Sequence, residues 1–146
     1  MKKLLTIAIC LFISFGITKA DDDKPINVNE LPQKAQVFIR QNFPKNEVSY
    51  AKMEKDFWDK KYEIVFVNGE KIEFDKNGNW EEVDCTFSFV PDTVIPKQIR
   101  DHISKQYPQS KIIKIERDTK EYEVKLNNKL ELKYTPTFQL KEIDHE

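Results

Sequence analysis

The sequence predicts an α+β fold: two tandem repeats, each of one helix followed by about four strands, form an antiparallel sheet with the helices on one face. Two observations support this prediction. A set of short motifs occurs twice in the same order. Within each copy, the spacing of apolar residues changes from a helical to a strand period. Because neither an amphipathic helix nor a one-sided sheet can bury its apolar face alone, we expect the helices to cover the sheet.

The two copies correspond residue by residue. The offset between them is 64 residues at the start of each copy and 60 residues further on. The corresponding segments are Leu31-Pro32 with Ile95-Pro96, Phe43-Pro44 with Tyr107-Pro108, Tyr62-Glu63-Ile64 with Tyr122-Glu123-Val124, and Glu82-Val83-Asp84 with Glu142-Ile143-Asp144. The missing residues are expected to be those at Phe57, Trp58 and Asp59, in a hairpin that is longer in the first copy. The pattern indicates a duplication.

Each copy is expected to open with a helix of about three turns. Pro32 and Pro96 suit the first helical position, where the N–H that proline lacks would be unpaired in any case. Pro44 and Pro108 disfavour helical geometry in the residue before them and so end each helix. We therefore expect helices near residues 32–42 and 96–106. Their apolar residues recur at helical spacing: Leu31, Ala35, Phe38, Ile39 and Phe43, then Ile95, Ile99, Ile103 and Tyr107.

Strands are expected to follow each helix as an antiparallel meander. The first strands are predicted at residues 47–55 and 110–117, and alternation predicts hairpins after them. With Asn127-Asn128-Lys129 as the second-copy loop, Leu126 lies opposite Leu130 and Val124 opposite Leu132. With Asn68-Gly69-Glu70 as the first-copy loop, Phe66 faces Ile72 and Ile64 faces Phe74. Asn77-Gly78 marks the next hairpin, and Thr135-Pro136-Thr137 replaces it in the second copy.

The first twenty residues have the pattern of a cleavable secretory signal peptide. Lys2 and Lys3 precede an apolar run, and small residues lead up to a cleavage site after Ala20. The alternative is a retained N-terminal anchor, although the apolar run is short for a membrane span. We expect a signal peptide at 1–20, a flexible tail at 21–27, repeats at 28–85 and 92–146, and a connector at 86–91 that packs as a strand extension.

Composition excludes several classes of partner. The net charge of −1 becomes −4 once the three lysines of the signal are removed, so no basic surface for nucleic acid is expected. No cationic amphipathic segment predicts membrane binding after signal cleavage. Cys85 is then the single cysteine; it is read as a buried apolar side chain, with a reactive thiol as the alternative.

The repeated segments resemble the bacterial PepSY-like family, often called beta-lactamase-inhibitor-like. Further residues that carry the resemblance are Phe38-Ile39, Phe74-Asp75-Lys76-Asn77-Gly78, Trp80 and Val83-Asp84-Cys85. The resemblance covers essentially all of the chain after the signal and implies a periplasmic protein. It also implies inhibition or chaperoning of peptidases, with which PepSY domains are generally associated. In architecture such proteins resemble a beta-lactamase inhibitor that binds its target with a concave sheet. This chain lacks the two intra-domain disulfides of that inhibitor.

No catalytic residues, metal site or cofactor are predicted. His102 occupies the helix position of Phe38 and is expected to be a partly buried boundary residue, while His145 lies next to the C-terminus. A cysteine and two distant histidines do not form a zinc site. Adjacent carboxylates such as Glu81 and Glu82 are expected on opposite faces of a strand, where they do not converge. We therefore expect a protein that is not an enzyme.

The candidate partner-binding residues are Phe57, Trp58, Val65 and Val67, with Tyr50 at the edge of the patch. They are expected to lie exposed on one connected surface, because exposed aromatic residues are favoured at protein interfaces. The alternative is that Phe57 and Trp58 cap the sheet edge. The predicted function is a periplasmic protein-binding or inhibitor-like module for a protein or peptide partner. The alternatives are an envelope structural or stress protein that self-associates, and a small-ligand binder with a pocket between helices and sheet.

Overall fold

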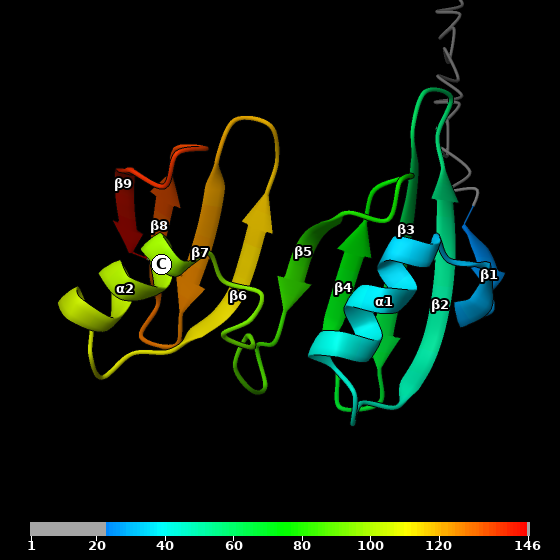
Figure 1. Cartoon of the computed structure of the whole chain (residues 1–146), viewed down its shortest axis with the longest axis horizontal. Coiled ribbons are helices and arrows are strands. Elements are labelled where there is room, and N and C mark those ends of the chain that lie inside the picture. Colours follow the sequence, from blue (N-terminus) through cyan, green and yellow to red (C-terminus); the bar gives the residue numbers. More distant parts are fainter. Residues whose placement is uncertain (1–22, 146) are drawn as a thin grey trace, which may run out of the picture.

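The computed structural model describes residues 23–145, so the predicted signal peptide lies outside the described residues. The described chain is an α+β structure with a sheet of nine strands and two α-helices (Figure 1). The elements are β1 (Lys24–Ile26), the 3₁₀ helix η1 (Val28–Glu30), α1 (Gln33–Asn42), β2 (Val48–Lys55), β3 (Lys60–Phe66), β4 (Lys71–Phe74), β5 (Trp80–Asp84), α2 (Lys97–Gln106), β6 (Ile112–Arg117), β7 (Tyr122–Leu126), β8 (Leu130–Tyr134) and β9 (Leu140–His145).

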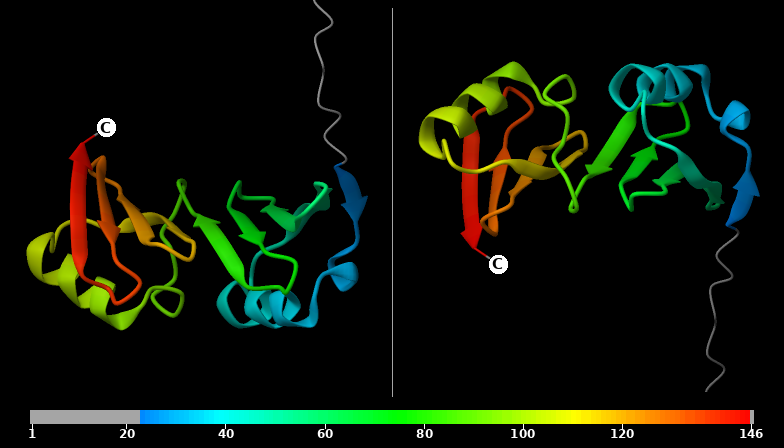
Figure 2. Two further views of the ribbon diagram at one scale, coloured as in Figure 1. Left: turned by 90° about the horizontal axis from the view of Figure 1, so that it is seen from above. Right: turned by 90° about the horizontal axis from the view of Figure 1, so that it is seen from below.

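The strands lie side by side in sequence order from β1 to β9, and every neighbouring pair is antiparallel. Strands β2 to β5 follow α1, and strands β6 to β9 follow α2. Both helices lie on the same side of the sheet (Figures 1 and 2). The predicted antiparallel α+β fold is therefore confirmed, and the sheet has an inner face towards the helices and an outer face away from them.

The core lies between the helices and the inner face. Its centre is a row of directly opposed side chains that crosses the sheet, which we call the central apolar row. Its members, from β2 to β9, are Ala51, Ile64, Ile72, Val83, Ile115, Val124, Leu132 and Ile143. All but Ile143 are buried, and Ala35 of α1 and Ile99 of α2 are buried in the same cluster.

The register predicted for the β7–β8 hairpin is right, and the register predicted for the β3–β4 hairpin is wrong. Val124 lies opposite Leu132 as expected. In the first hairpin Ile64 lies opposite Ile72, two residues away from the prediction, so the loop is Val67-Asn68-Gly69. Gly69 has a φ of +86°, and its N–H donates to the carbonyl oxygen of Phe66. The shift of two residues keeps the same side chains on the inner face, since strand side chains alternate with a period of two.

The β2–β3 hairpin is longer than β6–β7, but for a different reason from the one predicted. Both hairpins have a tip of four residues: Asp56 N–H donates to Asp59 O, and Asp118 N–H donates to Glu121 O. Strands β2 and β3 are each two residues longer than β6 and β7. The second tip therefore has Thr119 and Lys120 where the first has Phe57 and Trp58.

Two further expectations are wrong. Residues 24–26 of the predicted flexible tail form β1, which pairs with β2 and sets Ile26 opposite Ala51. The connector at 86–91 is a turn and not a strand, because Ser88 N–H donates back to Cys85 O. The connector is still fixed to the sheet, since Val90 is buried and its N–H donates to Ile112 O.

Candidate partner-binding surface

The outer face carries two rows of polar side chains. The first, which we call the acidic row, contains Lys52, Glu63, Glu73, Glu82, Glu116, Glu123, Lys133 and Glu142, each directly opposite the next. The second, which we call the mixed row, contains Tyr50, Val65, Lys71, Asp84, Lys114, Lys125, Glu131 and Asp144. Together they contain nine acidic residues and five lysines, so the outer face is net acidic.

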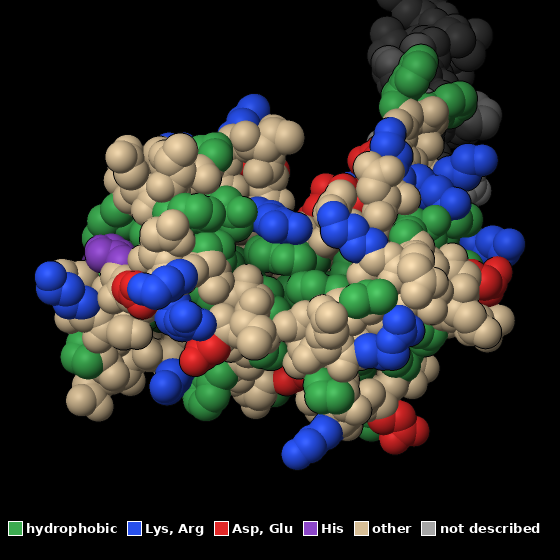
Figure 3. Space-filling model, viewed as in Figure 1, with side chains coloured by type: hydrophobic (Ala, Val, Ile, Leu, Met, Phe, Trp, Pro, Cys, Tyr) green, Lys and Arg blue, Asp and Glu red, His purple; other side chains and the backbone are tan. Residues whose placement is uncertain are grey.

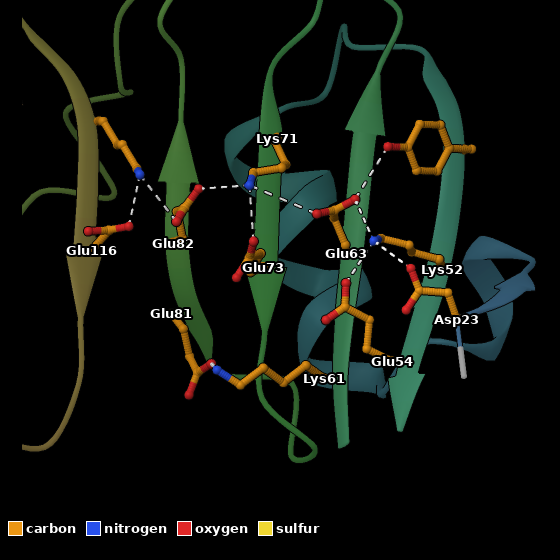
Figure 4. Close-up of polar contacts among 12 residues, drawn as sticks. Asp23, Lys52, Glu54, Lys61, Glu63, Lys71, Glu73, Glu81, Glu82 and Glu116 are labelled. Atoms are coloured by element: carbon orange, nitrogen blue, oxygen red, sulfur yellow. Dashed lines mark hydrogen bonds and ion pairs between the residues drawn. The ribbon is translucent and has the colours of Figure 1, made fainter. Parts of the chain in front are cut away.

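Lysine side chains form ion pairs that bridge neighbouring carboxylates of the acidic row (Figure 4). Lys71 Nζ lies 3.0 Å from Glu73 Oε1 and 3.1 Å from Glu82 Oε1. Lys114 Nζ lies 3.3 Å from Glu82 Oε2 and 2.8 Å from Glu116 Oε1. Burial by itself would lower the pKa of Lys71, but the hydrogen bonds to Glu73 and Glu82 outweigh it and raise the pKa. The lysines therefore stay charged and hold the carboxylates in a fixed arrangement.

Glu81 and Glu82 both project from the outer face, so the expectation that they point to opposite faces is wrong. Strand β5 has a bulge here: Glu82 lies opposite Glu73 and Trp80 opposite Phe74, which leaves Glu81 as the extra residue. Glu81 Oε2 lies 2.9 Å from Lys61 Nζ, as Figure 4 shows.

A hollow of about 250 Å³ lies over this bulge on the outer face. Its lining consists entirely of charged residues: Lys61, Glu73, Glu81, Glu82, Glu116, Arg117, Asp118, Glu121 and Glu123. Trp80 fixes the position of Arg117 in this lining: the guanidinium lies 3.9 Å from the centroid of the Trp80 ring, and Nε donates to Trp80 O at 2.8 Å. The lining suits a cationic group of a partner better than an anionic one.

Glu82 and Glu116 lie opposite each other across β5 and β6, and a hydrogen bond joins their carboxyl groups. The hydrogen bond to Glu82, together with burial, raises the pKa of Glu116 above its ordinary value. Burial alone would raise the pKa of Glu82 as well, but the hydrogen bond from Glu116 and the charges of Lys71 and Lys114 lower it. The hydrogen bond between the two carboxyl groups therefore shifts their pKa values in opposite directions.

The stability of the fold is expected to depend on pH through Glu123. Burial raises the pKa of Glu123 from 4.5 to about 7, and a hydrogen bond and charge repulsion from Glu131 add to the effect. Because the folded pKa lies above the unfolded value, stability falls as pH rises through the window from about 4.5 to 7. We expect Glu123→Gln to raise the free energy of unfolding at pH 8 by about 1 kcal/mol, after allowance for solvent screening.

Urea denaturation of the wild type and Glu123→Gln at pH 4.5 and pH 8 checks this. The two proteins should have nearly equal stability at pH 4.5 and differ at pH 8. An equal difference at both pH values would contradict the assignment to this carboxyl.

The structure places the predicted site residues at the two ends of β3. Phe57 and Trp58 stand at the tip of the β2–β3 hairpin with 96% and 93% of their surface exposed; hydrophobic side chains are visible at this tip in Figure 3. Tyr50 and half-buried Val65 lie opposite each other in the mixed row. Val67 is 65% exposed in the β3–β4 loop, at the opposite end of β3 from the tip.

The expected single connected patch is therefore wrong, because the length of β3 separates Phe57 and Trp58 from Val67. The sequence prediction also missed a second exposed apolar area. Phe87 is 80% exposed, and its ring lies against Gly69, next to Val67. The signal in the sequence is the pair Phe87 and Phe89 within the connector that was expected to pack as a strand extension.

A second hollow, of about 270 Å³, lies beside α2. Its lining is half apolar and half polar. The apolar members are Phe89, Val90, Ile95, Ile103 and Ile112, and the polar members are Asp92, Arg100, Ser104, Ser110 and Lys111. This hollow is where the small-ligand alternative would place its ligand.

His102 and Cys85 are both part of the packed structure. His102 Nδ1 lies 2.8 Å from the hydroxyl of buried Tyr134, which confirms the expected boundary position. Cys85 is buried and free, and burial raises the pKa of its thiol to about 12. Within residues 23–145, no group of three His, Cys, Asp or Glu side chains is arranged to hold a metal ion. No helix among these residues is long and apolar enough to cross a membrane.

Comparison with known proteins supplies a family and several solved structures. The family model described as "Putative beta-lactamase-inhibitor-like, PepSY-like" matches residues 18–64 and 60–142. A "putative periplasmic protein" of the DUF2874 family from Bacteroides vulgatus ATCC 8482 is 52% identical, with a TM-score of 0.84 over 86% of this chain and 99% of that one. A "putative calcium-regulated periplasmic protein" from Bacteroides thetaiotaomicron is 54% identical, with a TM-score of 0.84 over 85% and 98% of the two chains.

A further Bacteroides vulgatus ATCC 8482 structure, a "putative periplasmic protein of unknown function", is 34% identical. Its TM-score is 0.79, over 84% of this chain and 98% of that one. No curated protein matches the chain.

Proposed function

Since the chain belongs to the beta-lactamase-inhibitor-like, PepSY-like family, we propose that it is a non-catalytic periplasmic module that binds a protein or peptide partner. The binding surface comprises the outer face of the sheet and the tip of the β2–β3 hairpin. The observation that carries the proposal is the nearly complete exposure of Phe57 and Trp58 at that tip. Two aromatic rings on a two-stranded hairpin lose little entropy on docking and bury a large area.

The charge of the outer face adds a preference for a basic partner. Its carboxylates are already held in place by Lys71 and Lys114, so they need little rearrangement on binding. Charge pairs between the outer face and a partner would contribute more to partner choice and association rate than to affinity.

The proposed architecture includes a duplication. The β3–β4 and β7–β8 loops have the same hydrogen bond, from the third loop residue (Gly69 or Lys129) back to the strand, and the same left-handed φ at that residue. Four equivalently placed bulges, in β2, β5, β6 and β9, support the same origin. Features found in one copy alone are then where a partner-specific surface was added, and the aromatic tip is such a feature.

Capture from periplasmic extract tests the proposed function. The wild type is expected to retain a specific protein that Trp58→Ala retains much less, while the Tm of the two proteins stays nearly equal. A matched variant at the second tip, Lys120→Ala, should retain as much as the wild type. Equal capture by wild type and Trp58→Ala would contradict the proposal.

Export to the periplasm is part of the proposal, because related structures are described as periplasmic proteins. We expect the protein recovered from the periplasm to begin at Asp21, after cleavage behind Ala20. Intact mass measurement of that protein checks this. Recovery of the uncleaved N-terminus in the membrane fraction would show a retained anchor instead.

The calcium regulation named for the Bacteroides thetaiotaomicron protein is a description of that protein. In the part of this chain that the structure describes, lysines pair with several carboxylates of the outer face, namely Glu63, Glu73, Glu81, Glu82 and Glu116. The proposed function therefore rests on partner binding and does not include a metal ion.

A further inference from the structure

The sheet ends at β9 with its core incompletely covered. Each member of the central apolar row from Ala51 to Leu132 is at most 4% exposed, but Ile143 on β9 is 41% exposed. Leu140, on the same strand, is 42% exposed. Among the described residues, β9 pairs with β8 alone, so alternate residues of β9 direct backbone N–H and C=O groups away from the sheet.

Strand β5 shows how such an edge is completed within the same molecule. It is the fourth strand after its helix, as β9 is, and the two share a bulge, at Glu81 in β5 and at Lys141 in β9. On its far side β5 pairs with β6, which sets Val83 opposite Ile115 and Asp84 opposite Lys114. Val83, at the position equivalent to Ile143, is 0% exposed as a result.

The outward-facing side chains differ in the same way. Glu82 of β5 has 13% of its side chain exposed, and Lys71 and Lys114 flank it from both neighbouring strands. Its equivalent on β9, Glu142, has 55% of its side chain exposed, and it shares Lys133 of β8 with Asp144. On β5, the neighbouring strand β6 supplies a lysine to the outward-facing carboxylates. The carboxylates of β9 have no such lysine on the side away from β8 among the described residues.

The opposite edge of the sheet is protected. Strand β1 has only three residues and contains Pro25, which has no N–H to donate. Strand β9 has six residues and no proline. The contrast indicates that β9 is the edge left open for pairing.

We propose that the free edge of β9 binds an extended segment of a partner protein in which apolar residues alternate with lysine or arginine. The segment adds a tenth strand, antiparallel to β9. Its apolar side chains cover Ile143 and Leu140 on the inner face, and its basic side chains meet Glu142 and Asp144 on the outer face. The inference deepens the proposed partner binding and assigns it a second contact, separate from the aromatic tip.

Charge argues against a second copy of the chain as the occupant. Antiparallel pairing of β9 with itself, with Ile143 opposite Ile143 so that the inner faces coincide, would set Glu142 opposite Asp144 on both sides. Like charges directly opposite each other destabilise strand pairing. A basic segment has no such conflict.

Strand β6 supplies the probe, because it is the strand that completes the equivalent edge of β5. A fluorescently labelled peptide with the sequence Lys111 to Arg117 is titrated with the mature protein, and binding is followed by fluorescence anisotropy. The peptide carries Glu116→Lys, because Glu116 would otherwise face Glu142 in the register that β6 has on β5. We expect saturable binding that the same peptide carrying Ile115→Pro loses, since proline cannot pair in the ladder. The peptide carrying Lys114→Glu should bind at least tenfold more weakly.

Protein variants place the peptide on β9. Ile143→Lys should weaken binding at least tenfold, whereas Val67→Lys, an exposed position away from the edge, should not change it. Asp144→Lys should weaken binding of the basic peptide and restore binding of the Lys114→Glu peptide, which a merely unfolded variant cannot do. Phe57→Thr with Trp58→Lys should leave peptide binding intact, so that failure at the tip and failure at the edge are distinguishable.

Absence of saturable binding, or equal binding by wild type and Ile143→Lys, would overturn the proposal. So would a dimer of the free protein in sedimentation that Ile143→Lys dissociates, because the edge would then belong to a second copy.

Discussion

Leu132→Ala is expected to destabilise the fold by about 2–5 kcal/mol. Leu132 is fully buried in β8, between Val124 of β7 and Ile143 of β9 in the central apolar row. Removing the side chain loses its transfer free energy and leaves a cavity that the surrounding core residues cannot readily fill. Urea denaturation, with the m-value compared to that of the wild type, measures the effect.

Glu131→Ala is the matched control, because Glu131 is the adjacent residue and lies on the outer face. It should change the free energy of unfolding by no more than about 0.5 kcal/mol. A cost below about 1 kcal/mol for Leu132→Ala would mean that the register of β8 is displaced by one residue, since such a shift moves Leu132 to solvent.

Gly78→Ala is expected to cost about 2–4 kcal/mol, for two reasons that add. Gly78 has a φ of +82°, in the left-handed region where a Cβ is unfavourable. A Cβ here would also lie 2.8 Å from Pro32 Cβ and 2.9 Å from the backbone nitrogen of Ala35, at the start of α1. The β4–β5 turn and α1 would have to separate, and the helix would no longer pack on the sheet.

Gly69→Ala separates the two causes. Gly69 has nearly the same φ, +86°, but a Cβ there would meet only the ring of exposed Phe87, at 3.0 Å. It should therefore cost about 1 kcal/mol, the conformational part alone. Phe138, at the position equivalent to Gly78, has a φ of +66°, which shows that close approach and not φ alone requires glycine at position 78. Equal losses of stability in the two glycine variants, measured by thermal denaturation, would contradict this explanation.

The elements of the fold were predictable because their signals are local. Proline positions bounded α1 and α2 to within a residue, and alternation placed the apolar face of β7 and β8 correctly. The β3–β4 loop was misplaced by one residue because Val67 has strand character in the sequence. Only the backbone hydrogen bond from Phe66 N–H to Glu70 O shows that the loop begins at Val67.

The candidate site was less predictable because it depends on pairing across strands. Lys71 and Glu82 are distant in sequence, and β4 and β5 bring them to 3.1 Å. The bulge that turns Glu81 to the outer face has no distinctive sequence, so strict alternation put its carboxylate on the wrong side. The exposure of Phe57 and Trp58 was foreseen, but their separation from Val67 follows from the length of β3.

The most direct test of the proposed function is the affinity of the captured partner for two proteins with different tips. In one, Phe57→Thr and Trp58→Lys give the first hairpin the residues that stand at the second; in the other, Thr119→Ala and Lys120→Ala alter the second tip. Titration calorimetry should show at least tenfold weaker binding for the first protein and wild-type affinity for the second, with Tm unchanged in both. Wild-type affinity in the first protein, or a loss of several kcal/mol of stability, would show that the aromatic tip is not the partner-binding surface.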